Sequence, residues 1–171
     1  MLYRRLLRRP EGGVRVNLPL AERGLLIDMA STLRNVIEGV DADTPHDDVT
    51  GRLFPRAYED PLEQMQYAES MMGPLAESKR TLLDTFVESL HSGDVTDRRW
   101  RADLDPDQAA AWLAVLQDGR LVLSRAVGIE TEMDWERLET EDDEAALVLA
   151  YLGELLNSLV MLLMGGLQDP A

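Results

Sequence analysis

The sequence predicts a mainly all-α fold, with one domain over residues 1–171 built as a bundle of about five helices. Three observations support this prediction. A length of 171 residues suits one domain. Aromatic residues make up only 5% of the chain and leucine dominates the apolar positions, which favours helices over strands. Several long stretches also repeat their apolar residues with the helical period.

The first part of the chain predicts a short strand that leads into a helix. Residues 14–18 alternate apolar and polar side chains, as in a strand with one buried face. Residues 19–38 then carry apolar side chains on one helical face, and Glu22 lies on that same side in the first turn. Residues 99–104 also alternate, so the pattern allows a two-stranded β ribbon formed by 14–18 and 99–104.

Four further helices are predicted from their start signals and apolar stripes. Asp60-Pro61 opens the first of them, and Gly73-Pro74 is predicted to end it, because proline cannot continue the backbone hydrogen bonds of a helix. The four helices cover residues 61–72, 74–91, 105–129 and 141–164.

The last of these helices is apolar over more than half of its circumference. Such a helix is either the buried centre of a bundle or a dimer contact, which makes residues 144–164 a candidate homodimer surface. Its most apolar run, LLNSLVMLLMGGL, is interrupted by polar residues and is shorter than a membrane span, so no membrane association is expected.

The helix over 105–129 carries an arginine in an unusual position, within its apolar stripe. Asp105 and Gln108 form a capping-box pattern at its start. Trp112 lies in the apolar stripe, and Arg120 falls on the same side, where a guanidinium needs a partner or a route to water. Three interpretations of Arg120 follow. Its aliphatic stem packs on the core while its guanidinium reaches water, or the guanidinium forms a structural ion pair, or it binds a ligand. Glu22 is the candidate carboxylate for the ion pair.

The connections between the helices differ in character. Residues 39–50 and 130–143 form two acidic loops. Residues 51–61, GRLFPRAYEDP, combine basic and aromatic side chains on an ordered connection, and we expect Leu53, Phe54 and Tyr58 to dock into the core. This stretch is either a recognition surface or a buried plug between two helices. Its candidate interaction residues are Arg52, Phe54, Arg56 and Tyr58.

Charge is distributed unevenly along the chain. The formal net charge is −15, which disfavours nucleic acid and anionic membranes. Residues 1–9 nevertheless form a basic arm with four arginines. The arm either pairs with the acidic surface of the chain itself or clamps a phosphate or an acidic partner. Trp100 stands among Arg98, Arg99 and Arg101, an arrangement that allows stacking on bases.

The residues and motifs that several classes of catalytic chemistry require are absent from this sequence. The chain has no cysteine, which excludes disulfides and thiolate catalysis. It also has no P-loop, no HExxH and no GxSxG motif. His46 stands in an acidic loop, but one histidine beside carboxylates rarely fixes a metal. We therefore predict no catalytic residue, no metal site, no cofactor and no enzyme activity, and we expect a cytoplasmic protein because no secretory signal is visible.

Three segments, in the order GRLFPRAYEDP, AWLAVLQDGRLVLSRAVGI and YLGELLNSLVMLLM, resemble an actinobacterial domain-of-unknown-function family. The most specific patterns are RLFPxAY and aWLxxLxDxRLxL. The resemblance covers nearly the whole chain, and the family is commonly encoded beside the Clp protease adaptor ClpS and sulfur-metabolism genes. It implies a small cytosolic helical protein with a regulatory role, and it supplies no catalytic residue.

The function predicted from these observations is that of a non-catalytic regulatory or protein-interaction protein with a protein partner. The alternative is a DNA-binding transcriptional regulator that contacts phosphates with its basic arm. The two differ in salt dependence, because phosphate binding by arginines weakens steeply as salt rises.

Overall fold

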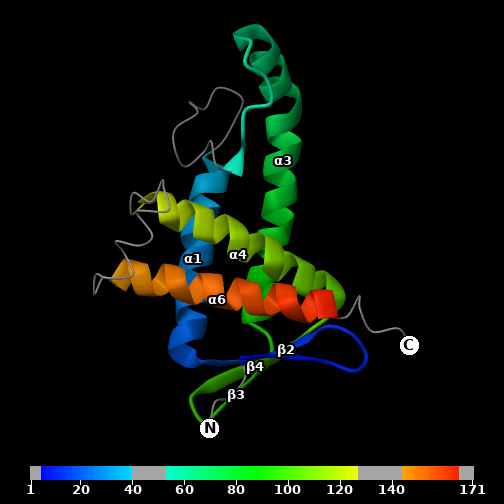
Figure 1. Ribbon diagram of the computed structural model, residues 1–171, viewed down its shortest axis with the longest axis vertical. Helices are drawn as coiled ribbons and strands as arrows, with labels where there is room; N and C mark the ends of the chain where they lie inside the picture. The colour runs from blue at the N-terminus through cyan, green and yellow to red at the C-terminus, as the bar shows by residue number, and fades with distance from the viewer. Residues whose placement is uncertain (1–4, 40–52, 127–143, 166–171) are drawn as a thin grey trace.

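The computed structural model (Figure 1) describes residues 5–39, 53–126 and 144–165. This part of the chain is mainly helical, as predicted, with four helices and a small antiparallel sheet of four strands. The elements are β1 (Leu6–Arg8), β2 (Val14–Pro19), α1 (Leu20–Glu38), α3 (Pro61–Leu90), β3 (Asp94–Thr96), β4 (Arg99–Leu104), α4 (Pro106–Ala126) and α6 (Glu144–Gly165).

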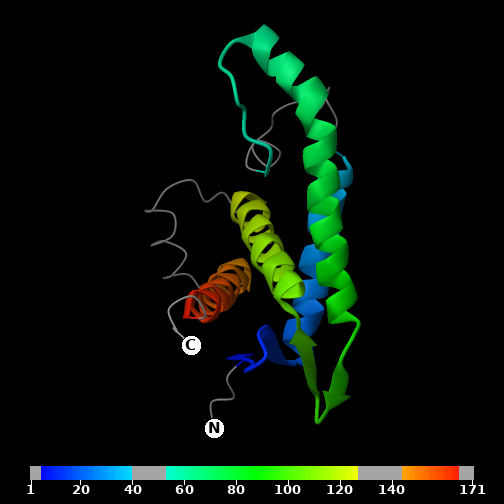
Figure 2. The ribbon, with the colours of Figure 1, turned by 90° about the vertical axis from the view of Figure 1, so that its right-hand side faces the viewer.

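The sheet has the strand order β1-β2-β4-β3 and lies at one end of the helices (Figures 1 and 2). Its central pair confirms the predicted pairing of 14–18 with 99–104, in a register that sets Val14 opposite Leu104. The expected two-stranded ribbon is too small, because β1 and β3 add an edge strand on each side. The residues that face the core alternate along the central pair: Val14, Val16, Leu18, Trp100, Ala102 and Leu104.

The predicted break at Gly73-Pro74 is wrong, because α3 runs without interruption from Pro61 to Leu90. Pro74 cannot donate a hydrogen bond to the carbonyl of Ser70, a defect that typically costs about 3 kcal/mol within a helix. Gly73 and Pro74 face solvent, where water can satisfy that carbonyl. Met72 and Ala76 are buried on the opposite side, so core packing holds the two halves of α3 in line. For this reason the described residues contain four helices rather than five.

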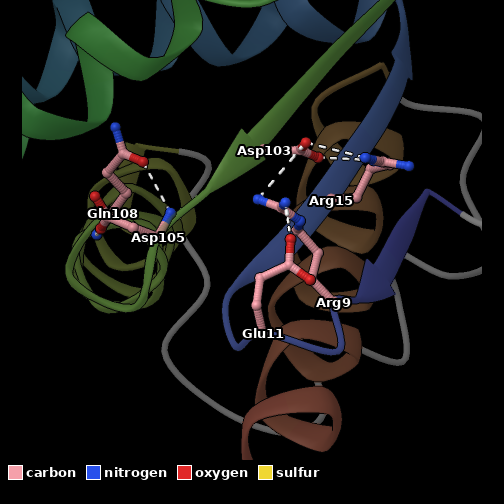
Figure 3. Close-up of polar contacts among 6 residues, drawn as sticks. All are labelled: Arg9, Glu11, Arg15, Asp103, Asp105 and Gln108. Carbon is pink, nitrogen blue, oxygen red and sulfur yellow. Dashed lines mark hydrogen bonds and ion pairs between the residues drawn. The ribbon is translucent and has the colours of Figure 1, made fainter.

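Helix α4 begins as predicted. The backbone amide of Asp105 donates to Gln108 Oε1 at 2.9 Å, and the amide of Gln108 donates to Asp105 Oδ1 at 2.8 Å (Figure 3). The two residues thus satisfy donors at the helix start that would otherwise lack partners.

Aromatic rings join the sheet to the helices. Trp100 of β4 stacks on Trp112 of α4 with ring centroids 6.2 Å apart, and Phe86 of α3 lies 4.9 Å from Trp112. The Trp112 Nε1 donates to the hydroxyl of Ser89 at 2.7 Å, so its polar atom is satisfied inside the core. Trp112 is therefore a core residue and does not lie on the surface.

Helix α6 forms an outer layer. It packs on α4 and beside β1, and α4 lies between it and α3 (Figure 2). Among the described helices, it alone is long and apolar enough to cross a membrane by length and composition. Core helices of soluble proteins pass the same test, so this is weak evidence for a span. The predicted absence of membrane association stays a prediction.

Helices α1 and α4 approach closely at Gly119. A Cβ atom at Gly119 would lie 2.4 Å from the Sδ of Met29, so the methionine side chain occupies the space that a larger residue would need. The missing side chain of Gly119 therefore sets the distance between the two helices.

Gly119→Leu should lower the free energy of unfolding by about 1–3 kcal/mol, because the added side chain overpacks the contact with Met29. Met29→Ala should make room for the added side chain, so that the double variant loses less free energy of unfolding than the two single variants lose in sum. Chemical denaturation measures all three. Gly24→Leu is the control, because no atom lies within 4 Å of the Cβ position there. Strictly additive losses would show that Met29 does not fill the space beside Gly119.

Candidate functional site

The N-terminal end of α3 projects beyond the other described helices (Figures 1 and 2). Several large apolar side chains are exposed on this end and on the segment just before it. Leu62 is 58% exposed and Met65 52% exposed, and the ring of Tyr58 packs edge-on against Tyr67 at 5.9 Å. Large apolar side chains gathered on a projecting element are typical of binding surfaces. We call this set the α3 tip; it comprises Tyr58, Leu62, Met65 and Met71.

The segment before α3 is tied down at both of its ends. Leu53 and Phe54 are buried in the core. Farther along, the buried side chain of Gln64 accepts hydrogen bonds from the backbone amides of Ala57 at 2.9 Å and Tyr58 at 3.0 Å. The α3 tip is therefore presented on a fixed backbone, which lowers the entropy cost of binding.

Residues 53–61 divide into a buried part and an exposed part. Leu53 and Phe54 form the buried plug, whereas Arg56 and Tyr58 are exposed. The expectation that Tyr58 docks into the core is wrong, because Tyr58 is exposed and its ring packs on Tyr67 instead. Arg52 lies outside the described residues.

Acidic side chains surround the α3 tip. They include Asp60, whose carboxylate accepts a hydrogen bond from the amide of Glu63 at 3.1 Å and so caps α3. A partner that contacts the apolar residues of the tip must therefore also meet negative charge. The exposed acidic residues of this rim are Glu59, Asp60, Glu63 and Glu69.

A second polar cluster joins β1, α1 and α6 around Glu22. Arg5 donates two hydrogen bonds to the Glu22 carboxylate, both at 2.9 Å, and its guanidinium also lies 3.8 Å from Glu154 and 5.5 Å from the centre of the Tyr151 ring. The structure thus pairs Glu22 with Arg5, and the expected pair with Arg120 is wrong. Arg5 directly precedes β1, whose place in the sheet brings the guanidinium to Glu22.

Arg120 lies in the contact between α4 and α6. A Cβ atom on Gly153 of α6 would lie 3.4 Å from the Arg120 Cζ, so the guanidinium packs directly against the glycine backbone. The side chain is only partly exposed. This position between two helices favours a structural role for Arg120.

Two described arginines of the basic arm, Arg5 and Arg9, face acids of the same chain. Arg9 lies beside Glu11 and 3.6 Å from Asp103, and Arg15 of β2 donates to Asp103 at 2.7 and 3.0 Å (Figure 3). The hydrogen bonds from Arg15 lower the pKa of Asp103. Together with the pair of Arg5 and Glu22, these contacts support the interpretation that the arm pairs with the chain's own acidic surface.

Trp100 is not available for stacking on bases. Its ring is buried under the helices and its Nε1 donates to the carbonyl of Ser92 at 2.6 Å. The alternative in which Trp100 stacks on bases is therefore wrong, and DNA binding stays a prediction without that contact. Within the described residues, no three histidine, aspartate or glutamate side chains gather as a metal site, and His46 lies outside these residues.

Sequence patterns alone do not single out Leu62 and Met65, because exposed and buried apolar residues can share the same helical spacing. The signal that points to them is their place in the first turns of α3, directly after the exposed segment with Arg56 and Tyr58.

Tyr151 of α6 has a pKa raised well above its usual value, first because burial disfavours the phenolate and then because Glu22 lies nearby. Its buried hydroxyl makes no well-formed hydrogen bond. A raised pKa means that folding favours the neutral phenol, so this contribution to stability is present below the unfolded pKa of 10.0 and is lost as pH rises above it.

Between pH 8 and pH 11 the wild-type protein should lose about 1 kcal/mol more stability than Tyr151→Phe, which has no group to ionise at this position. Urea denaturation at both pH values measures the difference. Tyr67→Phe, outside the cluster, controls for the loss of a phenol elsewhere. Equal alkaline losses in the wild type and in Tyr151→Phe would contradict the assignment.

A family model described as a domain of unknown function (DUF2017) matches residues 4–163. No curated protein and no solved structure matches the chain. The match spans all the described elements except the last residues of α6. The chain therefore belongs to the DUF2017 family.

Proposed function

We propose that this protein is a non-catalytic, cytoplasmic regulatory protein that acts by binding another protein through the α3 tip. One observation carries the proposal: Tyr58, Leu62 and Met65 are exposed together on a projecting helix end whose backbone is fixed by Gln64. Methionine side chains adapt to varied apolar surfaces, which suits such a contact.

The acidic rim defines the chemistry of the partner. Glu59, Asp60 and Glu63 stand beside the apolar residues, so a matching surface carries apolar side chains flanked by lysine or arginine. A basic amphipathic helix has this composition, and it would lie along the side of α3. The gene neighbourhood implied by the family resemblance makes the ClpS adaptor the first protein to test.

A photo-crosslinking amino acid at position 62 or 65 of the full chain should capture one protein from the native cytosol. The matched control is position 95, because Val95 on the sheet is 55% exposed, close to the 58% of Leu62. The captured protein is then purified and its affinity measured. Leu62→Ser and Met65→Ser should each weaken binding about tenfold or more, because buried apolar anchors dominate such contacts.

Val95→Ser should leave this affinity unchanged, and binding should weaken as salt rises because the rim is charged. If Leu62→Ser and Val95→Ser bind the purified protein with equal affinity, the α3 tip is not the binding surface.

We also propose that two copies of the chain associate through the outer face of α6. Leu147 and Met161 are each 65% exposed and lie equally far along α6 on either side of Glu154. In an antiparallel pair of α6 helices, each Leu147 would therefore meet Met161 of the second copy. Glu154 is the one charge near the middle of this face, and Arg5 lies 3.8 Å from it, so a second acidic chain can approach here with little repulsion.

Sedimentation velocity at rising protein concentration should reveal a monomer–dimer equilibrium. Met161→Glu should raise the dissociation constant at least about tenfold, because it buries a charge at the contact. Val95→Glu adds the same charge to the sheet and should have no effect. A wild-type protein that stays monomeric at every concentration would refute the dimer.

A further inference from the structure

A polar hollow of 460 Å³ lies on the side of the sheet that faces away from the helices. Its volume falls within the range of small-ligand pockets, roughly 300–1,000 Å³. The lining comes from β2, β3, β4 and the turn between β3 and β4, and it consists of Asn17, Asp94, Thr96, Asp97, Arg99 and Arg101.

One wall of the hollow is fixed by hydrogen bonds. The Nε of Arg99 donates to Asn17 Oδ1 at 2.8 Å, and its Nη2 donates to the carbonyl of Asn17 at 2.9 Å. These bonds link β4 to β2 across the sheet. The carbonyl oxygen of the Asn17 amide is engaged by Arg99, so the amide presents its N–H donors to other groups.

The turn at the end of the hollow is held in an unusual conformation. Asp97 and Arg98 both have positive φ, at 52° and 61°, which residues other than glycine rarely adopt. The backbone amide of Leu20, at the start of α1, donates to the carbonyl of Arg98 at 3.0 Å. The first residue of α1 thus anchors the turn that places Asp97 in the lining.

Asp94 and Arg101 stand next to each other in the hollow and form no ion pair with each other. Asp94 and Arg101 are cross-strand neighbours in the register of β3 and β4. Among the ion pairs of the described residues, none joins these two side chains. A cross-strand pair of opposite charge normally attracts. Here the positive and negative groups remain available to a third molecule.

We propose that this hollow binds a small zwitterion, an α-amino acid, with its carboxylate on Arg101 and its ammonium group on Asp94. Arg99 adds positive potential on the carboxylate side, and Asp97 adds negative potential on the ammonium side. A simple anion such as phosphate would have to approach two aspartates, and a simple cation would have to approach two arginines, so a molecule that carries both charges fits best. Asn17 and Thr96 supply neutral hydrogen-bonding groups.

The test is an NMR titration of the ¹⁵N-labelled full chain with L-alanine, L-alaninamide and N-acetyl-L-alanine. L-Alanine should shift the amide signals of residues 94–101 in a saturable way. Alaninamide lacks the carboxylate and the acetyl derivative lacks the ammonium group. Each should therefore bind about ten- to a hundredfold more weakly, as expected for the loss of one charged hydrogen-bonded contact.

Arg101→Gln and Asp94→Asn should each reduce the affinity for L-alanine by a similar factor. Arg15→Gln is the matched control, because Arg15 is an arginine of the same sheet that pairs with Asp103 and does not line the hollow. Unchanged amide signals outside the sheet show that each variant is folded. The proposal is overturned if L-alanine causes no saturable shift, if N-acetyl-L-alanine binds as well as L-alanine, or if Arg15→Gln loses as much affinity as Arg101→Gln.

Discussion

The pairing of β2 with β4 positions the rest of the described chain. β2 ends at Pro19 and α1 begins at the next residue, so the strand fixes where and in what direction α1 starts. β4 ends at Leu104, and the capping box at Asp105 turns the chain directly into α4. Two helices thus leave opposite ends of the same antiparallel strand pair, and they approach each other at Gly119.

The same strand pair separates two environments. Its core-facing side places Trp100 against Trp112, which joins the sheet to α4 and, through Phe86, to α3. Its other side carries Asn17, Arg99 and Arg101 of the polar hollow. Alternation along a strand makes this division unavoidable, because successive side chains point to opposite faces. The buried tryptophans therefore hold in place the surface on which the charged residues lie.

Local sequence patterns predicted those parts of the fold in which one period dominates. Residues 14–18 and 99–104 alternate, and the capping box at Asp105 involves only neighbouring residues, so both were predictable. The edge strands β1 and β3 have three residues each, too few to show an alternation. The predicted break at Pro74 was wrong because the rule for proline accounts only for the lost hydrogen bond. It takes no account of the packing of Met72 and Ala76, which lie on either side of Pro74 in the sequence.

The candidate sites were predictable only in part. The composition of residues 51–61 left a recognition surface and a buried plug as alternatives, and only the tertiary structure shows that Phe54 is buried and Tyr58 exposed. The partner of Glu22 depends on which arginine the tertiary structure brings near, and no local pattern carries that information. The polar hollow combines residues from three strands, so it exists only once the register of the sheet is known.

The distance along the chain between β2 and β4 also has a consequence for how the protein folds during synthesis. Arg15 and Asp103, which meet across the pair, are 88 residues apart in sequence. The hairpin of β1 and β2 can form as soon as it leaves the ribosome, and α1 follows directly, but β2 gains its second neighbour only after β4 has emerged. During that interval one edge of β2 stays unpaired, and long-range pairing of this kind is slow to form. The long, locally stabilised α3 helix is made in that interval.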